Sequence, residues 1–182
     1  MGYQSQYANT IGNNNVGIGL NALDANSAGD RNVAVGSRAL TDFNVTSTAD
    51  TYNTAVGYDA GARVTTGTLN TLVGGLAGDA ITTGERNVIA GHSAGGALTV
   101  GGSNTAIGDR ALLADTKGSN SVAVGRNALF AQNFTSATNA YNIAIGRGAG
   151  ATTVSYTHLR AHETPEHRGS RLQREKKKGG GG

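Results

Sequence analysis

Small and β-branched residues alternate over short stretches that recur along the chain, each starting at an asparagine and ending at a glycine. In NVAVG (32–36), NTAVG (53–57) and NIAIG (142–146), the first and third residues after the asparagine are β-branched and the residue between them is alanine. An alternation with a period of two predicts a β-strand, because successive side chains of a strand point to opposite faces. The pattern therefore predicts a series of short strands joined by tight turns.

The strand pattern belongs to a repeat that occurs eight times. Its first position is occupied by Asn15, Asn32, Asn53, Asn70, Asn87, Asn104, Ser121 and Asn142. Four residues later come Gly19, Gly36, Gly57, Gly74, Gly91, Gly108, Gly125 and Gly146. Three residues after the glycine come Ala22, Ala39, Ala60, Ala77, Ala94, Ala111, Ala128 and Ala149. The glycines are 17 residues apart, except at two places where the spacing is 21.

This regular spacing predicts that residues 1–153 form an all-β parallel β-solenoid of about eight coils. Strands this short bury little alone, but coils stacked about 4.8 Å apart share backbone hydrogen bonds. Stacked asparagines are expected to bond to their equivalents above and below. A helix is disfavoured because each interior glycine costs about 1 kcal/mol relative to alanine. We expect left-handed or tightly packed backbone at the repeat glycine, and left-handed backbone at the residue three before the asparagine, such as Gly29 or Asp50.

The two longer repeats match each other in sequence. LTDFNVTSTADTYN (40–53) aligns with LFAQNFTSATNAYN (129–142), 89 residues further on, with an asparagine, a Thr-Ser pair and a tyrosine at matching places. We therefore expect a longer loop to recur on the same side of the stack. Each loop contains a formal N-glycosylation sequence, at 44–46 and 133–135, whose residues we interpret as ordinary loop residues.

The repeat copies NVAVGSRAL, NTAIGDRAL and SVAVGRNAL resemble the head repeats of trimeric autotransporter adhesins, the YadA-like family, over about residues 9–150. The resemblance implies a left-handed parallel β-roll, three chains packed side by side, and a head that binds host surfaces or matrix proteins. The repeat is longer than the coil typical of those heads. GYDAG (57–61) and GGLAG (74–78) are also similar to repeats of phage tail fibres, so an origin in a virion remains an alternative.

Composition restricts the other possibilities. Three Phe, no Trp and 37% hydrophobic residues imply a thin, regular core, and the chain has no Cys with which to form a disulfide. Neither a signal peptide at the start nor a long apolar segment is present, so this segment is expected to make no membrane contact. The net charge of +3 resides in the last residues, because residues 1–153 hold eight basic and nine acidic side chains. We therefore expect no nucleic-acid partner.

Three kinds of chemistry do not fit the pattern of the repeat. GHSAG (91–95) matches the GxSxG motif of hydrolases, but its glycines occupy repeat positions, and the histidines downstream of Ser93 all lie beyond residue 153. The scattered aspartates lack the dense spacing of calcium-binding β-rolls. A flat threonine face of the ice-binding kind would be interrupted by Val16, Val33 and Val88. We expect no catalytic residue, no cofactor and no metal, and the sequence assigns no ligand-binding residue.

The repeat stops near residue 153, and residues 154–182 are predicted to be a disordered, non-native tail. VSYTHLRAHET (154–164) resembles the translation of a sequencing adapter, and EKKKGGGG (175–182) resembles a homopolymer read-through. The alternative is a basic tail able to touch nucleic acid or anionic membranes. If the tail is foreign, the natural protein continues in other sequence beyond residue 153.

Together these observations predict a non-enzymatic structural and binding module of a trimeric surface adhesin. It would be a homotrimer on the exterior of a bacterial cell, attaching to a host surface, matrix protein or glycan; the alternative is a tail fibre of a virion. The small middle residues Ala34, Ala55, Ala106, Ala123 and Ala144 are expected to allow close approach of backbones between the chains.

Overall fold

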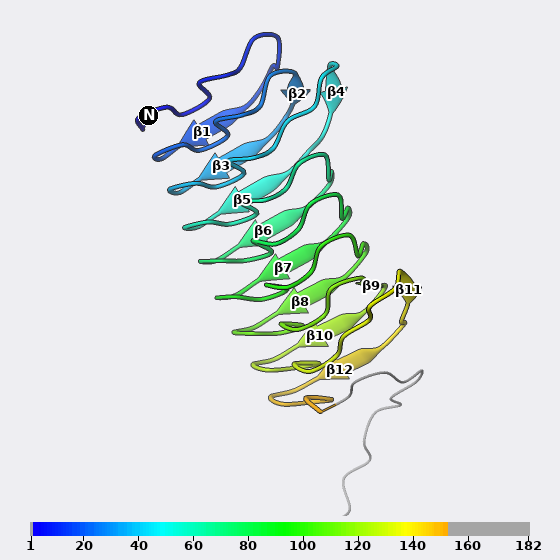
Figure 1. The fold of residues 1–182 in the computed structure, drawn as a ribbon. Helices are drawn as coiled ribbons and strands as arrows, with labels where there is room; N and C mark the ends of the chain where they lie inside the picture. Colours follow the sequence, from blue (N-terminus) through cyan, green and yellow to red (C-terminus); the bar gives the residue numbers. More distant parts are fainter. Residues whose placement is uncertain (1, 153–182) are drawn as a thin grey trace, which may run out of the picture.

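The computed structural model describes residues 2–152, which coil into a parallel β-solenoid of about eight turns with 17-residue spacing (Figure 1). Each turn adds one strand to an eight-stranded sheet, and this part of the chain contains no helix. The strands are β1 (Val16–Ile18), β3 (Val33–Val35), β5 (Thr54–Val56), β6 (Thr71–Val73), β7 (Val88–Ala90), β8 (Thr105–Ile107), β10 (Val122–Val124) and β12 (Ile143–Ile145). The predicted all-β solenoid is thus confirmed, while the left-handed sense of coiling stays a prediction.

Equivalent repeat positions pair across the sheet without a shift in register. Val33 pairs with Thr54, Thr54 with Thr71, and Thr71 with Val88, all in parallel. The repeat thereby brings each residue type above its own equivalent, and the side chains form straight columns along the stack. If one repeat position is apolar in every coil, for example, the stacked residues form a continuous apolar column on the surface or in the core.

The two insertions add a second pair of strands each. β2 (Gly29–Asp30) pairs with β4 (Ala49–Asp50), and β9 (Gly118–Ser119) pairs with β11 (Thr138–Asn139). Both insertions project from the same side of the stack, near β4 at one end and β11 at the other (Figure 1). This is the arrangement that their matching sequences predicted.

The interior is narrow and is filled by an exchange of sizes between two walls. In four of the six coils whose middle strand residue is small, the opposite wall carries Leu23, Leu40, Leu112 or Leu129, all fully buried. Ala55 is an exception, because its coil has Gly61 at that position and the side chains of Leu40 and Leu72 from the neighbouring coils lie against this glycine. Where the strand supplies Leu72 or Ile89, the facing residues are glycines. A Cβ built on Gly78 would lie 3.0 Å from Leu72 Cδ2, and one on Gly95 would lie 2.7 Å from Ile89 Cδ1. In this layer of the core the large side chain therefore comes from one wall or the other, while Phe43, Ile81 and Leu98 fill a second buried layer of their coils.

This packing overturns the prediction that the small middle residues face a neighbouring chain. Ala34, Ala55, Ala106 and Ala123 are completely buried inside the coil, and Ala144 is 4% exposed. The physical reason is space, because a small residue on the strand leaves room for the leucine of the opposite wall. The β-branched residues on either side of each alanine point outward instead.

The backbone has positive φ at the repeat glycines, as the sequence predicted, and at one further position of the repeat that the sequence did not predict. The repeat glycines have φ between 122° and 143°, and a Cβ on any of them from Gly19 to Gly125 would collide with the backbone of the next coil. The prediction for the residue three before the asparagine is wrong. There, a Cβ on Gly84 would lie 2.5 Å from Gly101 O, so packing requires the glycine. The left-handed residue is the one directly before the asparagine, as at Arg31 (φ 59°) and Leu69 (φ 61°).

Residues 2–14 form the return half of a further coil that the sequence did not reveal. Gly2 lies against Gly19, and Gln4 and Gln6 have the left-handed backbone of their equivalents Asn21 and Leu23. The amide of Gln6 donates to Ala22 O over 3.0 Å. The described stack therefore begins one half-turn before β1. The predicted tail, residues 154–182, lies outside the described residues.

Candidate interaction surface

The outer face of the eight-stranded sheet consists of two straight columns of side chains. The first column contains Val16, Val33, Thr54, Thr71, Val88, Thr105, Val122 and Ile143. The second contains Ile18, Val35, Val56, Val73, Ala90, Ile107, Val124 and Ile145. With seven intervals of about 4.8 Å, the columns are about 34 Å long. We refer to these residues as the outer sheet face.

The outer sheet face is largely apolar, with Thr54, Thr71 and Thr105 as its polar members, and its side chains are partly or fully open to solvent. Val73 is 41% exposed, Val88 42%, Ile107 41% and Ile143 55%. Valine and isoleucine side chains gain roughly 1.5–3 kcal/mol each when they are buried, so leaving a column of them in water is unfavourable. Contiguous apolar surface of this kind on a soluble protein is typical of an interaction site.

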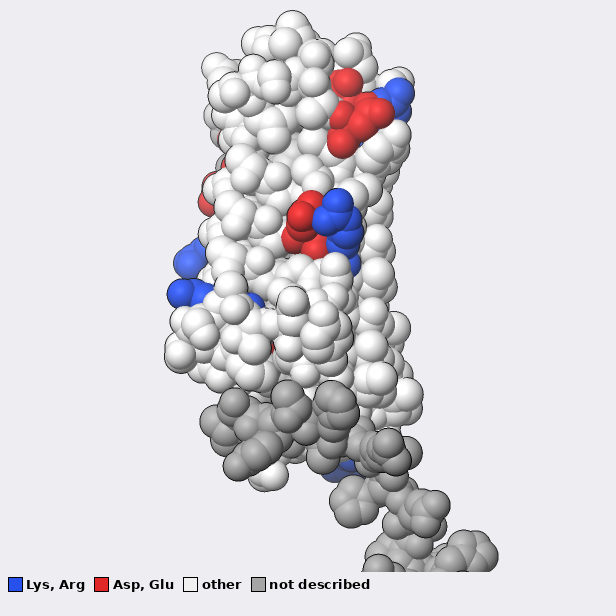
Figure 2. Space-filling view, turned by 90° about the vertical axis from the view of Figure 1, so that its right-hand side faces the viewer, with Lys and Arg blue, Asp and Glu red and all other residues white. Residues whose placement is uncertain are grey.

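None of the residues of the outer sheet face is charged. The charged side chains of the described residues lie at turns and corners, where they form pairs such as Arg38 with Asp59 (3.3 Å) and Arg126 with Asp109 (3.3 Å). On the side from which the insertions project, acidic and basic side chains lie together in small groups on a mostly uncharged surface (Figure 2). The outer sheet face can thus meet an apolar partner without desolvating a charge.

A ladder of buried asparagines holds the strands of this face in register. From Asn32 to Ser121, the backbone amide of each ladder residue donates to Oδ1 of the asparagine one coil before it, as from Asn70 to Asn53 (3.0 Å) and from Asn87 to Asn70 (3.0 Å). The Nδ2 group of Asn70 donates to the carbonyl of Gly84 over 2.9 Å. These bonds satisfy polar groups in a fully buried position and fix where each strand begins.

The ladder changes its chemistry where Ser121 replaces asparagine. The buried Gln132 fills the gap: its Nε2 lies 3.1 Å from Ser121 Oγ and 2.6 Å from Asp115 Oδ2, and its Oε1 accepts from Asn142 Nδ2 over 2.7 Å. Asp115 in turn accepts the backbone amides of Gly118 and Phe134. The buried side chain of Asp115 therefore accepts three hydrogen bonds.

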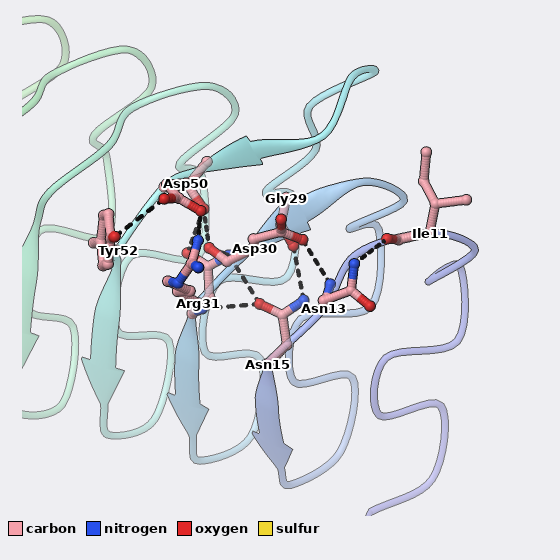
Figure 3. A network of polar contacts seen from close by, with 10 residues as sticks. Ile11, Asn13, Asn15, Gly29, Asp30, Arg31, Asp50 and Tyr52 are labelled. Carbon is pink, nitrogen blue, oxygen red and sulfur yellow. Dashed lines mark hydrogen bonds and ion pairs between the residues drawn. The ribbon is translucent and has the colours of Figure 1, made fainter.

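At the start of the stack, the ladder and the first insertion meet in one polar network (Figure 3). Asn15 donates to Gly29 O over 2.7 Å. Arg31 forms an ion pair with Asp50 of the insertion, and its guanidinium lies 5.7 Å from the centre of the Tyr52 ring. The Tyr52 hydroxyl donates to Asp50 Oδ2 over 3.1 Å. Asp50 is thereby tied to the preceding coil, which anchors the base of the projecting loop.

The structure places the predicted repeat residues behind the surface rather than on it. The asparagine and alanine columns are internal, apart from the partly exposed ends Asn15 and Ala149, and the glycines form the turns. Ser93 of the GHSAG segment has φ 52°, the same left-handed turn as its repeat equivalents Asp59 and Arg110. His92 lies 3.4 Å from Asp109 on an exposed corner. The serine and its glycines therefore follow the geometry of the repeat.

Neither a metal centre nor a membrane span is found in the part of the chain that the structure describes. No three His, Cys, Asp or Glu side chains come together there in a way that would hold an ion. Nor does that part contain a helix of the length and hydropathy needed to cross a bilayer. Comparisons with known protein families, with curated proteins and with solved structures returned no match.

The sequence pattern identifies the alternating residues of each strand, but the small middle residues were predicted to lie at the contact between chains, where the structure has the flanking residues outside. The alternation shows that two faces of the strand differ, and it does not show which of them is inside. The residue four after the repeat glycine contains that information, since it is glycine opposite the large strand residues Leu72 and Ile89. This size compensation marks the middle residue as internal, and the flanking residues follow as external.

Proposed function

We propose that this chain is a non-enzymatic structural and binding module of a trimeric surface adhesin, in which the outer sheet faces of three chains pack together. The observation that supports the proposal is the uncharged double column of partly or fully exposed residues, all of them β-branched except Ala90. β-Branched side chains have few rotamers, so they lose little conformational entropy when a second surface covers them. The number three and the surface location follow from the resemblance to adhesin head repeats.

The proposal also assigns a role to the sides of the stack that the interface leaves free. A trimer built on the outer sheet face keeps the turns and the two insertions accessible, and it presents three copies of each. Multivalent display raises the apparent affinity for a host surface, matrix protein or glycan without any new contact. The module would thus act as a rigid, repetitive support for weak individual contacts.

Charge placed on the outer sheet face tests the interface. Val56 and Val73 are paired neighbours of that face on β5 and β6. We expect the full chain to sediment as a trimer and the double variant Val56→Glu, Val73→Glu to sediment as a folded monomer, because six carboxylates would be buried together. Thr66→Glu with Thr83→Glu adds the same charge at exposed positions of the same coils and should leave the trimer intact. A wild-type chain that sediments as a monomer at micromolar concentration would contradict the proposal.

A further inference from the structure

The two insertions carry a motif that assembly of the solenoid does not use. Each contains an asparagine followed two residues later by threonine, Asn44-Val45-Thr46 and Asn133-Phe134-Thr135. No other asparagine of residues 2–152 has serine or threonine at that distance. In the ladder this follows from the fold, because the residue two after the asparagine is the buried middle residue of the strand. The motif thus lies only in the two loops that leave the stack.

The backbone of both loops presents the asparagine and the threonine outward together. Asn44 and Thr46 are exposed, whereas Val45 between them packs against the core. In the second loop Asn133 and Thr135 are exposed, and Phe134 points inward. A Cβ on Gly118 would lie 2.9 Å from Phe134 Cδ2. In both loops the asparagine and the threonine are therefore exposed to an enzyme, while the residue between them is turned toward the stack.

Hydrogen bonds orient the amide of each asparagine with its oxygen toward the stack. The backbone amide and the hydroxyl of Ser27 donate to Asn44 Oδ1 over 3.2 and 2.7 Å. In the same way the Thr116 hydroxyl donates to Asn133 Oδ1 over 3.0 Å. Within residues 2–152, Nδ2 of neither asparagine has a hydrogen-bond partner. Among the described residues, Nδ2 is therefore the amide atom of each asparagine that has no partner.

Asn44 and Asn133 occupy the position eight residues after the repeat glycine, where most other coils have threonine. The equivalent residues of the shorter coils include Thr65, Thr82 and Thr99, whose hydroxyls donate to the carbonyl of the next coil. Asn44 and Asn133 make no such bond along the stack. Their amide groups accept hydrogen bonds from the preceding coil through Oδ1 but, unlike the threonines, donate none to a described residue, and both occur where the chain is longer by four residues.

We propose that Asn44 and Asn133 are acceptor sites for N-linked glycans in the folded protein. Nδ2 would attack C1 of a sugar activated as a nucleotide or lipid pyrophosphate. The C1–N bond forms, the C1–O bond breaks, the pyrophosphate group leaves with the bonding electrons, and Nδ2 loses a proton to a base of the transferase. The bonds to Oδ1 are retained throughout. Five coils separate the two sites, about 24 Å along one side of the stack.

This proposal is independent of the trimer, since both acceptors belong to the insertions and not to the outer sheet face. Glycans there would cover polar surface on the side shown in Figure 2, where the exposed charges are few and paired. A bulky, hydrated sugar on each loop would limit adhesion between fibres along that side. The oligomeric state should be unchanged by the modification.

The experiment incubates the folded full chain with UDP-glucose and a soluble N-glycosyltransferase that accepts both Asn-x-Thr and Asn-x-Ser, followed by intact mass spectrometry and peptide mapping. We expect two hexoses per chain, one on Asn44 and one on Asn133. Thr46→Ala should abolish the first and keep the second, Thr46→Ser should retain both, and Thr48→Ala, in the same loop but outside the motif, should change nothing.

The enzyme's standard acceptor peptide in the same tube serves as a positive control. A folded chain that receives no hexose, or receives it on other asparagines, would overturn the proposal, and sedimentation of the same samples reports on the trimer separately.

Discussion

At the scale of single residues, the repeat glycine determines how closely two coils approach. Gly57 has φ 143°, and a Cβ at this position would collide with the carbonyl oxygen of Gly74 in the next coil. Gly146 has a similar φ of 122°, but no atom of the described residues lies within 4 Å of a Cβ built on it. A side chain at Gly57 would thus suffer both backbone strain and collision with the next coil, whereas a side chain at Gly146 would suffer backbone strain alone.

The comparison gives a measurable prediction. Gly57→Ala should lower the free energy of unfolding by about 3–5 kcal/mol, because strain and collision both act. Gly146→Ala should lower it by about 1–2 kcal/mol, from strain alone. Urea denaturation followed by circular dichroism measures both values. Equal losses in the two variants would show that close stacking of the glycines contributes nothing beyond their backbone conformation.

Asp79 links stability to pH through a single side chain. Burial raises the pKa of its carboxyl above the ordinary 3.8, and Asp59 adds to this, while a backbone hydrogen bond and Arg63 act in the opposite direction. The folded state therefore holds this proton to higher pH than the unfolded state does. Its contribution to stability falls as pH rises from 3.8 through the folded pKa and stays unfavourable above it.

Replacing that carboxyl by an amide should accordingly stabilise the protein at neutral pH. For Asp79→Asn we expect a gain of up to about 0.5 kcal/mol, a modest value because the side chain is only partly buried. The gain should disappear below pH 3.8, where the aspartic acid is neutral in both states. Denaturation midpoints of both chains at neutral and acidic pH provide the test. A variant that is less stable than wild type at neutral pH would mean that the hydrogen bonds and Arg63 outweigh burial.

At the scale of the strands, the sequence predicts well where each strand starts and ends, but it predicts poorly which face of the strand is internal. The strand ends are local features, since an asparagine starts each strand and a glycine ends it, and eight copies repeat the signal. Which face is internal depends on the opposite wall of the coil, several residues away. The internal face is revealed by complementary sizes across the coil: the large Leu72 faces Gly78, and the small Ala34 faces Leu40. Pairwise size compensation within a coil is therefore the signal to seek in related repeats.

Two further features of the elements lack a compositional signal. The left-handed residue before each asparagine is Arg31, Tyr52, Leu69 or Arg86 in four of the coils, residue types that do not ordinarily mark this conformation. The half coil of residues 2–14 has Ser5 in place of the repeat alanine and lacks a strand of its own. In both cases stacking on the neighbouring coil imposes the backbone geometry. Local sequence could not supply it, because the interactions that decide it are about 17 residues away.

At the scale of the whole molecule, the described stack has a continuous core but leaves one long apolar face uncovered. Coils exchange hydrogen bonds only with their neighbours, so stability along the stack accumulates coil by coil. The side chains of the outer sheet face point away from the core and take no part in these hydrogen bonds. If it packs against other copies of the chain, folding and association are linked, and thermal stability depends on protein concentration.

A trimer makes that dependence quantitative. Tenfold dilution lowers the stability of a folded trimer by about 0.9 kcal/mol per chain, two thirds of the roughly 1.4 kcal/mol that one decade of concentration represents. For a chain of this size, Tm should then fall by about 2–4 °C per tenfold dilution. The variant Val56→Glu, Val73→Glu should melt at a lower temperature that is the same at every concentration. Thr66→Glu with Thr83→Glu should keep the wild-type dependence, because its added charges lie off the outer sheet face. A wild-type Tm that does not change over a hundredfold range of concentration, in a chain that is folded throughout, would show that water, and not another copy, covers the outer sheet face.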